Sequence, residues 1–320
     1  MKILSSLCAI AVLTTATATV NAQKVDTVVG GLNNPCGIAI QPETGTIFVA
    51  DSGAGRIVKI VEGKLHNVVT DFPIDVYGKG PKFNIGPLGI GFLGKNTLVV
   101  GGGGNIDDKE RLRVYDVSGG TKKAADMVAS FGLKANEDLK AEGNYYGVAV
   151  MDSGIFVTCN GDDTEGWIAK ANHKKGKVKN FKRFIASKEA TEVDAPVAVT
   201  NNKKGELVVG QMGEISIPED GLVTIYNAKS GKMISNHEVG LSDITALAYG
   251  KNGKLYATDF NWLDTKKGGL FVVDLEGEDS EKVVGLDKPT AIAVGKDGAM
   301  YITVIGTGDD NPGKVVKVSW

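Results

Sequence analysis

Short apolar segments separated by polar turns run along almost the whole chain. The first clear group, residues 32–60, contains the apolar segments GIAI, TIFVAD and RIVKI, with Gly, Asn, Asp or Lys clustered between them. Apolar, β-branched segments of about four to eight residues between such turn residues are typical of β-strands. Residues 32–60 therefore predict three consecutive strands joined by short turns.

The same grouping recurs along the chain. A small residue inside the first strand of each unit serves as an anchor, and the six anchors are Ala39, Gly91, Ala149, Ala198, Ala248 and Ala293. Successive anchors lie 52, 58, 49, 50 and 45 residues apart, and a second and a third apolar segment follow each of them. Units of this length with three or four short strands are typical of propeller blades, and helical periodicity is nearly absent. The chain therefore predicts an all-β, six-bladed β-propeller.

The two ends of the chain predict how the ring closes. The sixth unit stops at Trp320, just after its third strand, whereas residues 25–30 form an extra strand before the first unit. This extra strand resembles the fourth strand of the fifth unit, residues 281–286, and both lead into the next unit through the same Leu-x-x-Pro spacing. We expect the N-terminal strand to complete the last blade and remove its exposed edge, which makes residues 23–320 a single domain.

The first residues have the pattern of an export signal. Lys2 gives a positive start, residues 7–13 an apolar segment, and residues 20–22 a small-residue cleavage motif. The apolar segment is too short to span a bilayer comfortably. We therefore predict that residues 1–22 are a signal peptide and that the mature protein is secreted or periplasmic.

Cysteine content and charge narrow the classes of function. Only Cys36 and Cys159 remain after cleavage, and the sequence leaves open whether they form one disulfide or stay as thiols. The formal net charge of −2 gives no reason to expect nucleic acid as a partner. Beyond the leader, no apolar stretch is long enough for membrane insertion.

Residues 32–60 closely resemble an NHL repeat, whose pattern is L-x-x-P-x-G-I-A-V, then G-x-I-Y-V-A-D-S, then R-I. The match is fair over residues 286–304 and only structural in the other units, and units two to four lack the D-S step. NHL proteins and the related gluconolactonase and strictosidine-synthase-like proteins are six-bladed propellers. The resemblance therefore implies the same fold, whereas activity depends on the site that each protein carries.

Oxygen-bearing side chains are predicted to gather on one face of the propeller. The loops that enter each first strand and those that leave each second strand meet there, and Asn and Asp dominate these positions. The resemblance to gluconolactonase-like propellers implies a divalent cation at the centre of this face, and oxygen donors suit Ca²⁺. The positions most like that ligand set are Asn34, Asn144, Asp194 and Asp259. The alternative is that these residues make local Asx-turns.

Four further residues are candidates for ligand binding on the same face. Asp51 and Asp243 belong to the same rings of loop residues, while Trp262 and Tyr145 lie in or beside longer loops where aromatic side chains can contact a ligand. Packing between blades is the alternative for the aromatic pair. Acidic pairs in the long loops predict an electronegative face that attracts cations or basic partners. Solvated loop tips are the alternative for these carboxylates.

Two classes of function follow from the sequence. The first is a secreted or periplasmic binding module that holds a small ligand, a glycan or a protein through its acidic loop face. The alternative is a metal-dependent hydrolase of the lactonase or esterase type, with a cation in the central funnel. No G-x-S-x-G motif is present, and His66, His173 and His237 lie away from the predicted face, so no catalytic residue is assigned.

Overall fold

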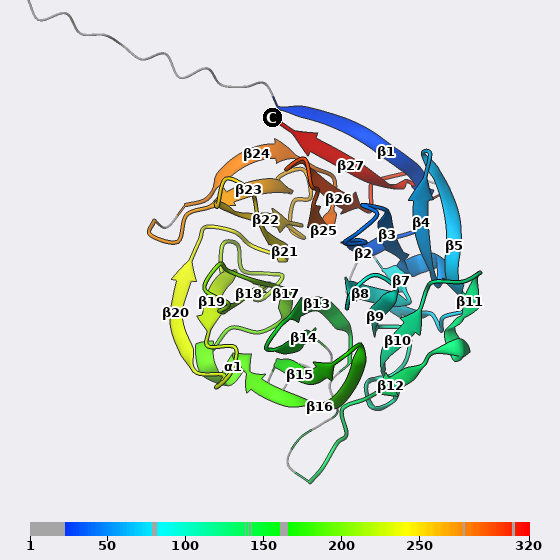
Figure 1. The fold of residues 1–320 in the computed structure, drawn as a ribbon. Helices are drawn as coiled ribbons and strands as arrows, with labels where there is room; N and C mark the ends of the chain where they lie inside the picture. Colours follow the sequence, from blue (N-terminus) through cyan, green and yellow to red (C-terminus); the bar gives the residue numbers. More distant parts are fainter. Residues whose placement is uncertain are drawn as a thin grey trace, which may run out of the picture.

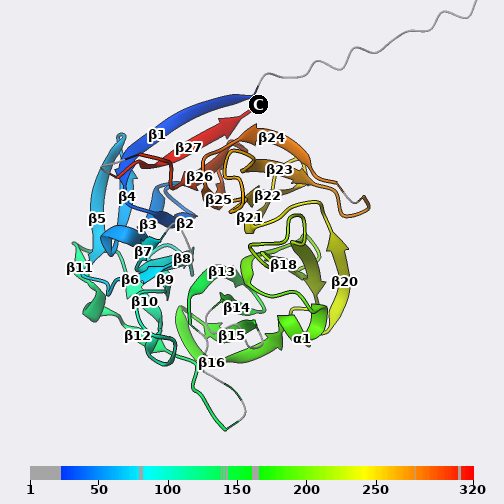
Figure 2. The same ribbon diagram turned by 180° about the vertical axis from the view of Figure 1, so that it is seen from behind.

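Six β-sheets stand in a ring around a central axis, each forming one blade of a propeller (Figures 1 and 2). This computed structural model describes residues 23–320 except residues 79–81, 138, 140, 142, 161–165, 278 and 309–310. The predicted signal peptide, residues 1–22, lies outside the described residues. No helix in the described part of the chain has the length and apolar character needed to cross a membrane. The prediction of an all-β, six-bladed propeller is confirmed.

The strands of the first three blades follow one another from the axis outward in chain order. Blade 1 contains β2 (Pro35–Ile40), β3 (Ile47–Asp51), β4 (Arg56–Val61) and β5 (Lys64–Thr70), with β11 (Lys122–Lys123) added in parallel at its outer edge. Blade 2 contains β8 (Pro87–Phe92), β9 (Thr97–Gly102), β10 (Leu112–Asp116) and β12 (Ala129–Phe131). Blade 3 contains β13 (Tyr145–Met151), β14 (Gly154–Cys159), β15 (Trp167–Lys174) and β16 (Lys177–Ala186).

The other three blades repeat this order, and the last one borrows a strand. Blade 4 contains β17 (Pro196–Asn201), β18 (Leu207–Gln211), β19 (Leu222–Tyr226) and β20 (Met233–Glu238). Blade 5 contains β21 (Ile244–Tyr249), β22 (Leu255–Asp259), β23 (Gly269–Val273) and β24 (Glu281–Gly285). Blade 6 contains β25 (Pro289–Val294), β26 (Met300–Val304), β27 (Gly313–Ser319) and β1 (Lys24–Leu32). Connections add the hairpin of β6 (Asp75–Tyr77) and β7 (Phe83–Ile85), the 3₁₀ turns η1 (Ser52–Ala54), η2 (Asp107–Lys109) and η3 (Ala124–Asp126), and α1 (Ser187–Thr191).

Strand β1 closes the ring, as the sequence predicted. It runs antiparallel to β27, from Lys24 opposite Ser319 to Leu32 opposite Gly313, and the two strands lie side by side near the C-terminus in Figure 1. This pairing satisfies the outer edge of β27 and places both ends of the described chain in one blade.

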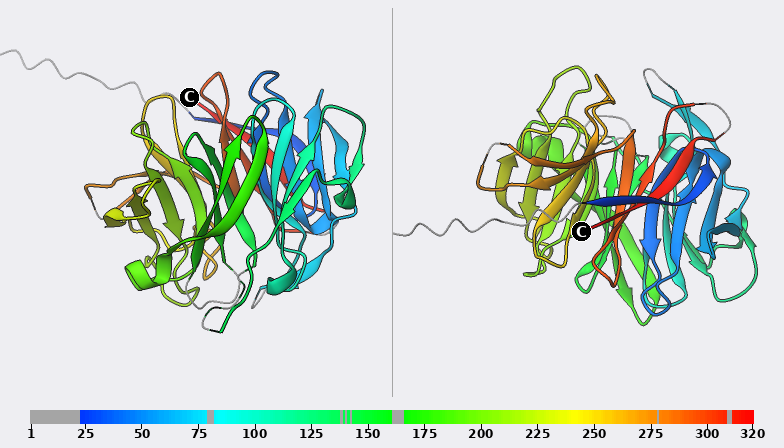
Figure 3. Two further views of the ribbon diagram at one scale, coloured as in Figure 1. Left: turned by 60° about the horizontal axis from the view of Figure 1, so that its bottom comes forward. Right: turned by 90° about the horizontal axis from the view of Figure 1, so that it is seen from above.

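One apolar cluster fills each space between neighbouring blades, where the sheets stand face against face (Figure 3). Phe48 and Ile57 of blade 1 pack with Leu98 of blade 2. Val49, the neighbour of Phe48 in β3, instead packs with Val315 of blade 6. Consecutive residues of a strand point to opposite faces. Strands buried on both faces therefore read as continuous apolar segments, as the sequence indicated.

Hydrogen bonds and close backbone contacts also join neighbouring inner strands. The hydroxyl of Thr290 donates to the carbonyl of Pro35 at 2.6 Å, which links blade 6 to blade 1, and Thr245 links blade 5 to blade 6 in the same way. An added Cβ at Gly89 would lie only 2.1 Å from the carbonyl oxygen of Tyr146 in the next blade. Glycine is therefore required there for the two inner strands to approach.

The anchor predicted for blade 4 is two residues early. In blade 1, the first paired residue after the bulge of the inner strand is Gly37, which precedes the anchor Ala39 by two residues. In blade 4, the corresponding first residue after the bulge is Ala198. The residue of blade 4 that matches Ala39 is therefore Thr200, and the prediction of Ala198 is corrected. The anchors of the other five blades occupy equivalent positions in their pairing patterns.

Candidate functional site

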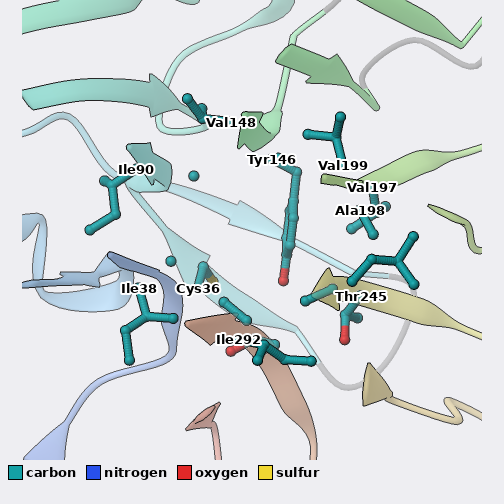
Figure 4. A pocket seen from close by; sticks show the side chains of 17 residues that line it. Cys36, Ile38, Ile90, Tyr146, Val148, Val197, Ala198, Val199, Thr245 and Ile292 are labelled. Carbon is teal, nitrogen blue, oxygen red and sulfur yellow. The ribbon is translucent and has the colours of Figure 1, made fainter. Parts of the chain in front are cut away.

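A ring of six side chains surrounds the axis where the inner strands begin. Every inner strand shifts its register directly after its first residue, and a bulge of this kind re-aims the side chain that it carries. We call this ring the neck, and its members are Cys36, Leu88, Tyr146, Val197, Thr245 and Thr290. Figure 4 shows Cys36, Tyr146 and Thr245 directed into the same space.

On one side of the neck the axis is lined by aliphatic side chains. Two residues beyond each neck position, where a strand points in the same direction again, stand Ile38, Ile90, Val148, Val199, Leu247 and Ile292. They line a cavity of about 70 Å³. A polar ligand finds no partner in this ring, so the candidate site lies on the other side of the neck.

On the loop side, the neck forms the floor of a concave space that we call the mouth pocket. Its walls add the amides of Asn34, Asn144 and Asn160, the aromatic rings of Tyr77, Phe83, Phe260 and Trp262, and the apolar side chains of Ile85, Met212, Ile215 and Ile305. Among the described lining residues there is no Asp, Glu, Lys, Arg or His. The mouth pocket is therefore an uncharged, mainly apolar site with a few amide and hydroxyl groups.

The β6–β7 hairpin supplies one wall of the mouth pocket from the opposite side of the ring. It belongs to the connection between blades 1 and 2, yet the ring of Phe83 lies 5.7 Å from that of Trp262 and 6.3 Å from that of Phe260, both in blade 5. The amide of Asn34 donates to the carbonyl of Asn84 at 2.7 Å and holds the hairpin to blade 1. Aromatic stacking and this hydrogen bond together fix the hairpin over the axis.

Asn34 and Asn144 occupy a backbone position that explains their residue type. Both have φ of 46°, and Lys288 at the equivalent position of blade 6 has φ of 59°. Asn adopts this left-handed region more readily than most residues. The amide nitrogens of Asn34 and Asn144 donate to the carbonyls of Asn84 and Asn160, at 2.7 and 3.2 Å. Local turn geometry thus accounts for both residues, while both side chains still line the mouth pocket.

Asp51 and Asp259 hold the loops that enter the inner strands. The carboxylate of Asp51 accepts the backbone N–H of Asn33 at 2.6 Å and the Nε–H of Arg56 at 2.7 Å. Asp259, at the matching position of blade 5, accepts the N–H of Asp243 at 2.9 Å. These buried carboxylates are therefore engaged within their own blades and do not line the mouth pocket.

Of the four predicted metal donors, Asn34 and Asn144 line the mouth pocket, whereas Asp194 and Asp259 do not. Asp194 forms an ion pair with Lys188 at 3.1 Å and accepts the N–H of Ala195 at 2.6 Å, while Asp259 is engaged as described above. Within the described part of the chain, no group of three or more His, Cys, Asp or Glu side chains could hold a metal ion. The residues present therefore do not fit a Ca²⁺ site built from Asn34, Asn144, Asp194 and Asp259.

The two aromatic candidates have different surroundings. Trp262 lines the mouth pocket, as expected for a ligand contact. Tyr145 is fully buried between blades, where it packs against Phe181 and its hydroxyl accepts the N–H of Leu133 at 3.1 Å. Its neighbour Tyr146 occupies the neck instead, because the bulge in β13 turns that side chain toward the axis.

The thiol and phenol of the neck stay protonated at neutral pH. Burial raises the pKa of Cys36 to about 12, although hydrogen bonds with Ser52 and Tyr146 lower it in part. Burial also raises the pKa of Tyr146 well above its ordinary value. Cys36 is thus a poor nucleophile. Cys36 and Cys159 are both buried thiols and are not joined in a disulfide.

Asp243 lies behind the aromatic wall and is hydrogen-bonded to its residue Trp262. Its carboxylate accepts the backbone N–H of Trp262 at 2.6 Å and is almost fully buried. Burial raises the pKa of Asp243 to about 7; the bond from Trp262 lowers it, and the charges of Asp259 and Asp220 raise it further. This side chain supports the position of Trp262 and does not line the mouth pocket itself.

The predicted acidic character of the loop face does not extend into the mouth pocket. Glu214, Glu219 and Asp220 lie in the connection between β18 and β19, outside the pocket lining. The carboxylates of Asp162, Asp163, Glu165, Asp309 and Asp310 lie outside the described residues. Among the described residues, uncharged side chains therefore line the centre of this face.

Sequence reasoning missed the residues that give the mouth pocket its aromatic character. Phe83 and Tyr77 come from the connection between blades 1 and 2, where residues 71–86 form an unusually long link between outer and inner strands. Aromatic residues in a long loop were one available signal. The reach of that loop across the ring to blade 5 is set by tertiary packing and has no local signature.

No protein-family model matches the chain, and no curated protein matches it. Among similar solved structures, a protein from Thermus thermophilus that carries the name glucose dehydrogenase is 18% identical, with a TM-score of 0.62 over 93% of this chain and 100% of that one. A PQQ-bound aldose sugar dehydrogenase from Streptomyces coelicolor is 14% identical, with a TM-score of 0.61 over 93% and 99%. A gluconolactonase from Xanthomonas campestris is 11% identical, with a TM-score of 0.61 over 92% and 89%. The predicted relation to gluconolactonase-like propellers is confirmed for the fold.

The mouth pocket does not fit PQQ. This cofactor carries three carboxylates, whose binding in a buried site requires cationic partners. None of the described residues that line the mouth pocket is a lysine or an arginine. Lys288, the nearest basic side chain in the ring of turn residues, is engaged by Asp287 at 3.0 Å and by the carbonyl of Gly306 at 3.0 Å.

Proposed function

We propose that the protein binds a small, uncharged organic molecule with a flat, mainly apolar body in the mouth pocket. One observation carries this proposal: four aromatic side chains from two separate connections surround a pocket above the neck whose described lining residues are all uncharged. A concave, mainly apolar site with a few convergent polar groups is the usual form of a small-molecule site. The amides of Asn34, Asn144 and Asn160 orient the bound molecule.

Binding of an uncharged aromatic probe tests this proposal. We expect N-phenyl-1-naphthylamine to bind the mature protein with enhanced fluorescence, and Trp262→Ala to weaken binding at least about tenfold, because a buried aromatic contact is lost. Trp320→Ala is the matched control, since Trp320 packs against Tyr256 at the rim of the ring. Equal losses in the two variants, or no binding by the unaltered protein, would contradict the proposal.

Catalysis on the bound molecule is the second candidate, and the comparisons favour it over a docking module for proteins or glycans. The similar structures include sugar dehydrogenases and gluconolactonases, which are enzymes. The corresponding activity here is hydrolysis of a small, uncharged lactone or ester. A metal-dependent form of this reaction finds support only in the amide oxygens of Asn34 and Asn144 at the pocket wall.

Metal analysis separates the two candidates. We expect purified protein to contain no stoichiometric divalent cation and EDTA to leave its Tm unchanged, because Asp194 and Asp259 are engaged elsewhere. Activity on δ-gluconolactone is measured in the same samples. A bound cation that is lost in Asn34→Ala, together with lactone hydrolysis, would establish the enzyme and show that our metal expectation is wrong.

A further inference from the structure

The outer hairpin of blade 3 carries an unusual concentration of positive charge. Residues 167–188, which include β15 and β16, contain eight Lys and Arg residues and no Asp or Glu, in a chain whose formal net charge is −2. Strand β16 forms the outer rim of blade 3 (Figures 1 and 2). The positive charge therefore lies at the outer rim of the ring, and binding in the mouth pocket does not explain it.

Like charges stand directly opposite one another in this hairpin. Lys174 pairs with Lys177 and Lys170 with Lys182 in the antiparallel ladder. Like charges at directly opposed positions destabilise a sheet. Among the described residues, none of these four lysines has a carboxylate partner in an ion pair. The opposed charges are thus not balanced by carboxylates of the described chain, as expected for a surface whose counter-charges come from a ligand.

Protection of a sheet edge does not account for this charge. Lysines on edge strands discourage pairing with other chains. The outermost strands of the other five blades, however, carry at most two lysines each and no arginine. Strand β16 carries Lys177, Lys179, Lys182 and Arg183. The outer edges of the other blades therefore avoid pairing with other chains while carrying less positive charge than β16.

A groove lined by residues of blades 2, 3 and 4 contains further basic side chains. It has a volume of about 690 Å³ and is lined by His173, Lys204 and Lys229, with Asp152 as its one carboxylate among the described residues. The Oγ of Ser153 also lines it, and this buried atom has no hydrogen-bond partner in the described part of the chain. His173 belongs to β15, next to Lys174 in the chain, so the groove and the lysine hairpin share this strand.

We propose that the hairpin and this groove together bind a linear acidic polysaccharide. Lysines two residues apart on a strand, such as Lys177 and Lys179, lie about 7 Å apart on one face and form a row that suits a chain of repeated carboxylate or sulfate groups. The groove offers the amide of Asn201 as a partner to sugar hydroxyls. This surface is separate from the mouth pocket, so a negative result for one proposal does not affect the other.

Two other polyanions fit this surface less well. Single-stranded nucleic acid binds through exposed aromatic side chains on which bases stack, whereas Phe181 and Phe184 pack against the apolar clusters between blades. An anionic membrane is held by apolar side chains together with basic ones. Residues 167–188 contribute none of the large exposed apolar side chains of the described chain.

The test compares two variants of the full mature chain with the same change in net charge. Lys174→Glu, Lys179→Glu and Lys182→Glu reverse the row and also turn both like-charge pairs into opposite-charge pairs, so the variant should fold at least as well. Lys64→Glu, Lys254→Glu and Lys266→Glu reverse three exposed lysines elsewhere. Heparin and polygalacturonate serve as sulfated and unsulfated chains, with a single-stranded oligonucleotide and phosphatidylserine vesicles as alternatives.

We expect the unaltered protein to bind at least one acidic chain at about 50 mM NaCl, with affinity falling steeply as salt rises. The row variant should bind at least about tenfold more weakly, with a smaller salt dependence, while the control variant stays within about threefold. Absence of binding, or equal losses in both variants, would overturn the proposal. Tighter binding to the oligonucleotide or to vesicles would overturn the choice of polysaccharide.

Discussion

A chain of residues 32–320 is expected to have more than about 5 kcal/mol less unfolding free energy than a chain of residues 23–320, and this loss is most of the stability of an ordinary domain. These residues supply nearly all of β1, which pairs with β27 along its length. The loss would expose the edge of β27 and open the apolar cluster between blades 6 and 1. Val29 is buried in that cluster beside Val315 and Val49.

The ring makes this loss larger than that of an edge strand in an open sheet. Blade 6 contacts blade 1 through the Thr290–Pro35 hydrogen bond as well as through the apolar cluster. When blade 6 lacks its outer strand, its remaining strands have less surface to hold the ring shut, and both neighbours lose packing. We therefore expect loss of cooperative unfolding, not a small shift in its midpoint.

Urea unfolding followed by circular dichroism measures this effect. A synthetic peptide of residues 23–32, added in trans, is the control, because it should restore the β27 edge and recover part of the stability. A peptide of the same composition in scrambled order should not. If the truncated chain unfolds at the same urea concentration as the mature chain, β1 does not close the ring.

The fold could be predicted from the sequence because each blade repeats one pattern. The pattern does not, however, determine the exact register of each inner strand. In blade 4 the anchor was placed at Ala198, whereas the matching residue is Thr200. Side chains alternate with a period of two, so a slip of two residues leaves every side chain on its original face. Only the position of the bulge, which depends on pairing with β18, distinguishes the two registers.

The candidate site was less accessible, for reasons that particular residues show. Of two adjacent tyrosines, Tyr145 is buried between blades and Tyr146 points to the axis, because a bulge shifts the alternation at that point. Asp51 and Asp259 were correctly placed at the ends of second strands, but their carboxylates turn back to hold incoming loops. The sequence predicts on which face such a residue lies. The direction of its side chain depends on the turn geometry, which the sequence does not determine.

The arrangement of charge could also be predicted from the sequence only in part. Acidic residues in the long loops suggested an acidic site, yet the mouth pocket is lined by none of them in the described part of the chain. The lysines of residues 167–188 were visible in the sequence, but their opposed pairing, such as Lys174 with Lys177, comes from the register of β15 and β16. In the described part of the chain, charge therefore lies on the periphery, and mainly apolar side chains line the centre of the loop face.

Asp243→Asn is expected to raise the unfolding free energy at pH 8 by about 2 to 4 kcal/mol. The folded-state pKa of Asp243 is about 7, above the ordinary value of 3.8, mainly because the carboxyl is buried. Between these two values the folded protein holds a proton that the unfolded chain has released. Stability therefore falls by up to about 1.4 kcal/mol per pH unit as pH rises through this window, and the loss is complete above pH 7.

The asparagine removes this cost and keeps the supporting contact. Its side-chain oxygen can still accept the N–H of Trp262, which Asp243 accepts at 2.6 Å, while the repulsion from Asp259 and Asp220 disappears. The mouth pocket should therefore keep its shape, because the Trp262 wall is held as before. Probe binding at pH 8 should change less than about twofold, whereas the stability change is large.

Urea unfolding of both proteins at pH 5 and pH 8 provides the measurement. The stability advantage of the variant should be large at pH 8 and much smaller at pH 5, where Asp243 is protonated in the folded protein. Asp297→Asn is the opposite control, because a hydrogen bond with Lys317 lowers the pKa of that exposed carboxyl, and its removal should not stabilise the fold. An advantage of the same size at both pH values would show that Asp243 does not titrate between them.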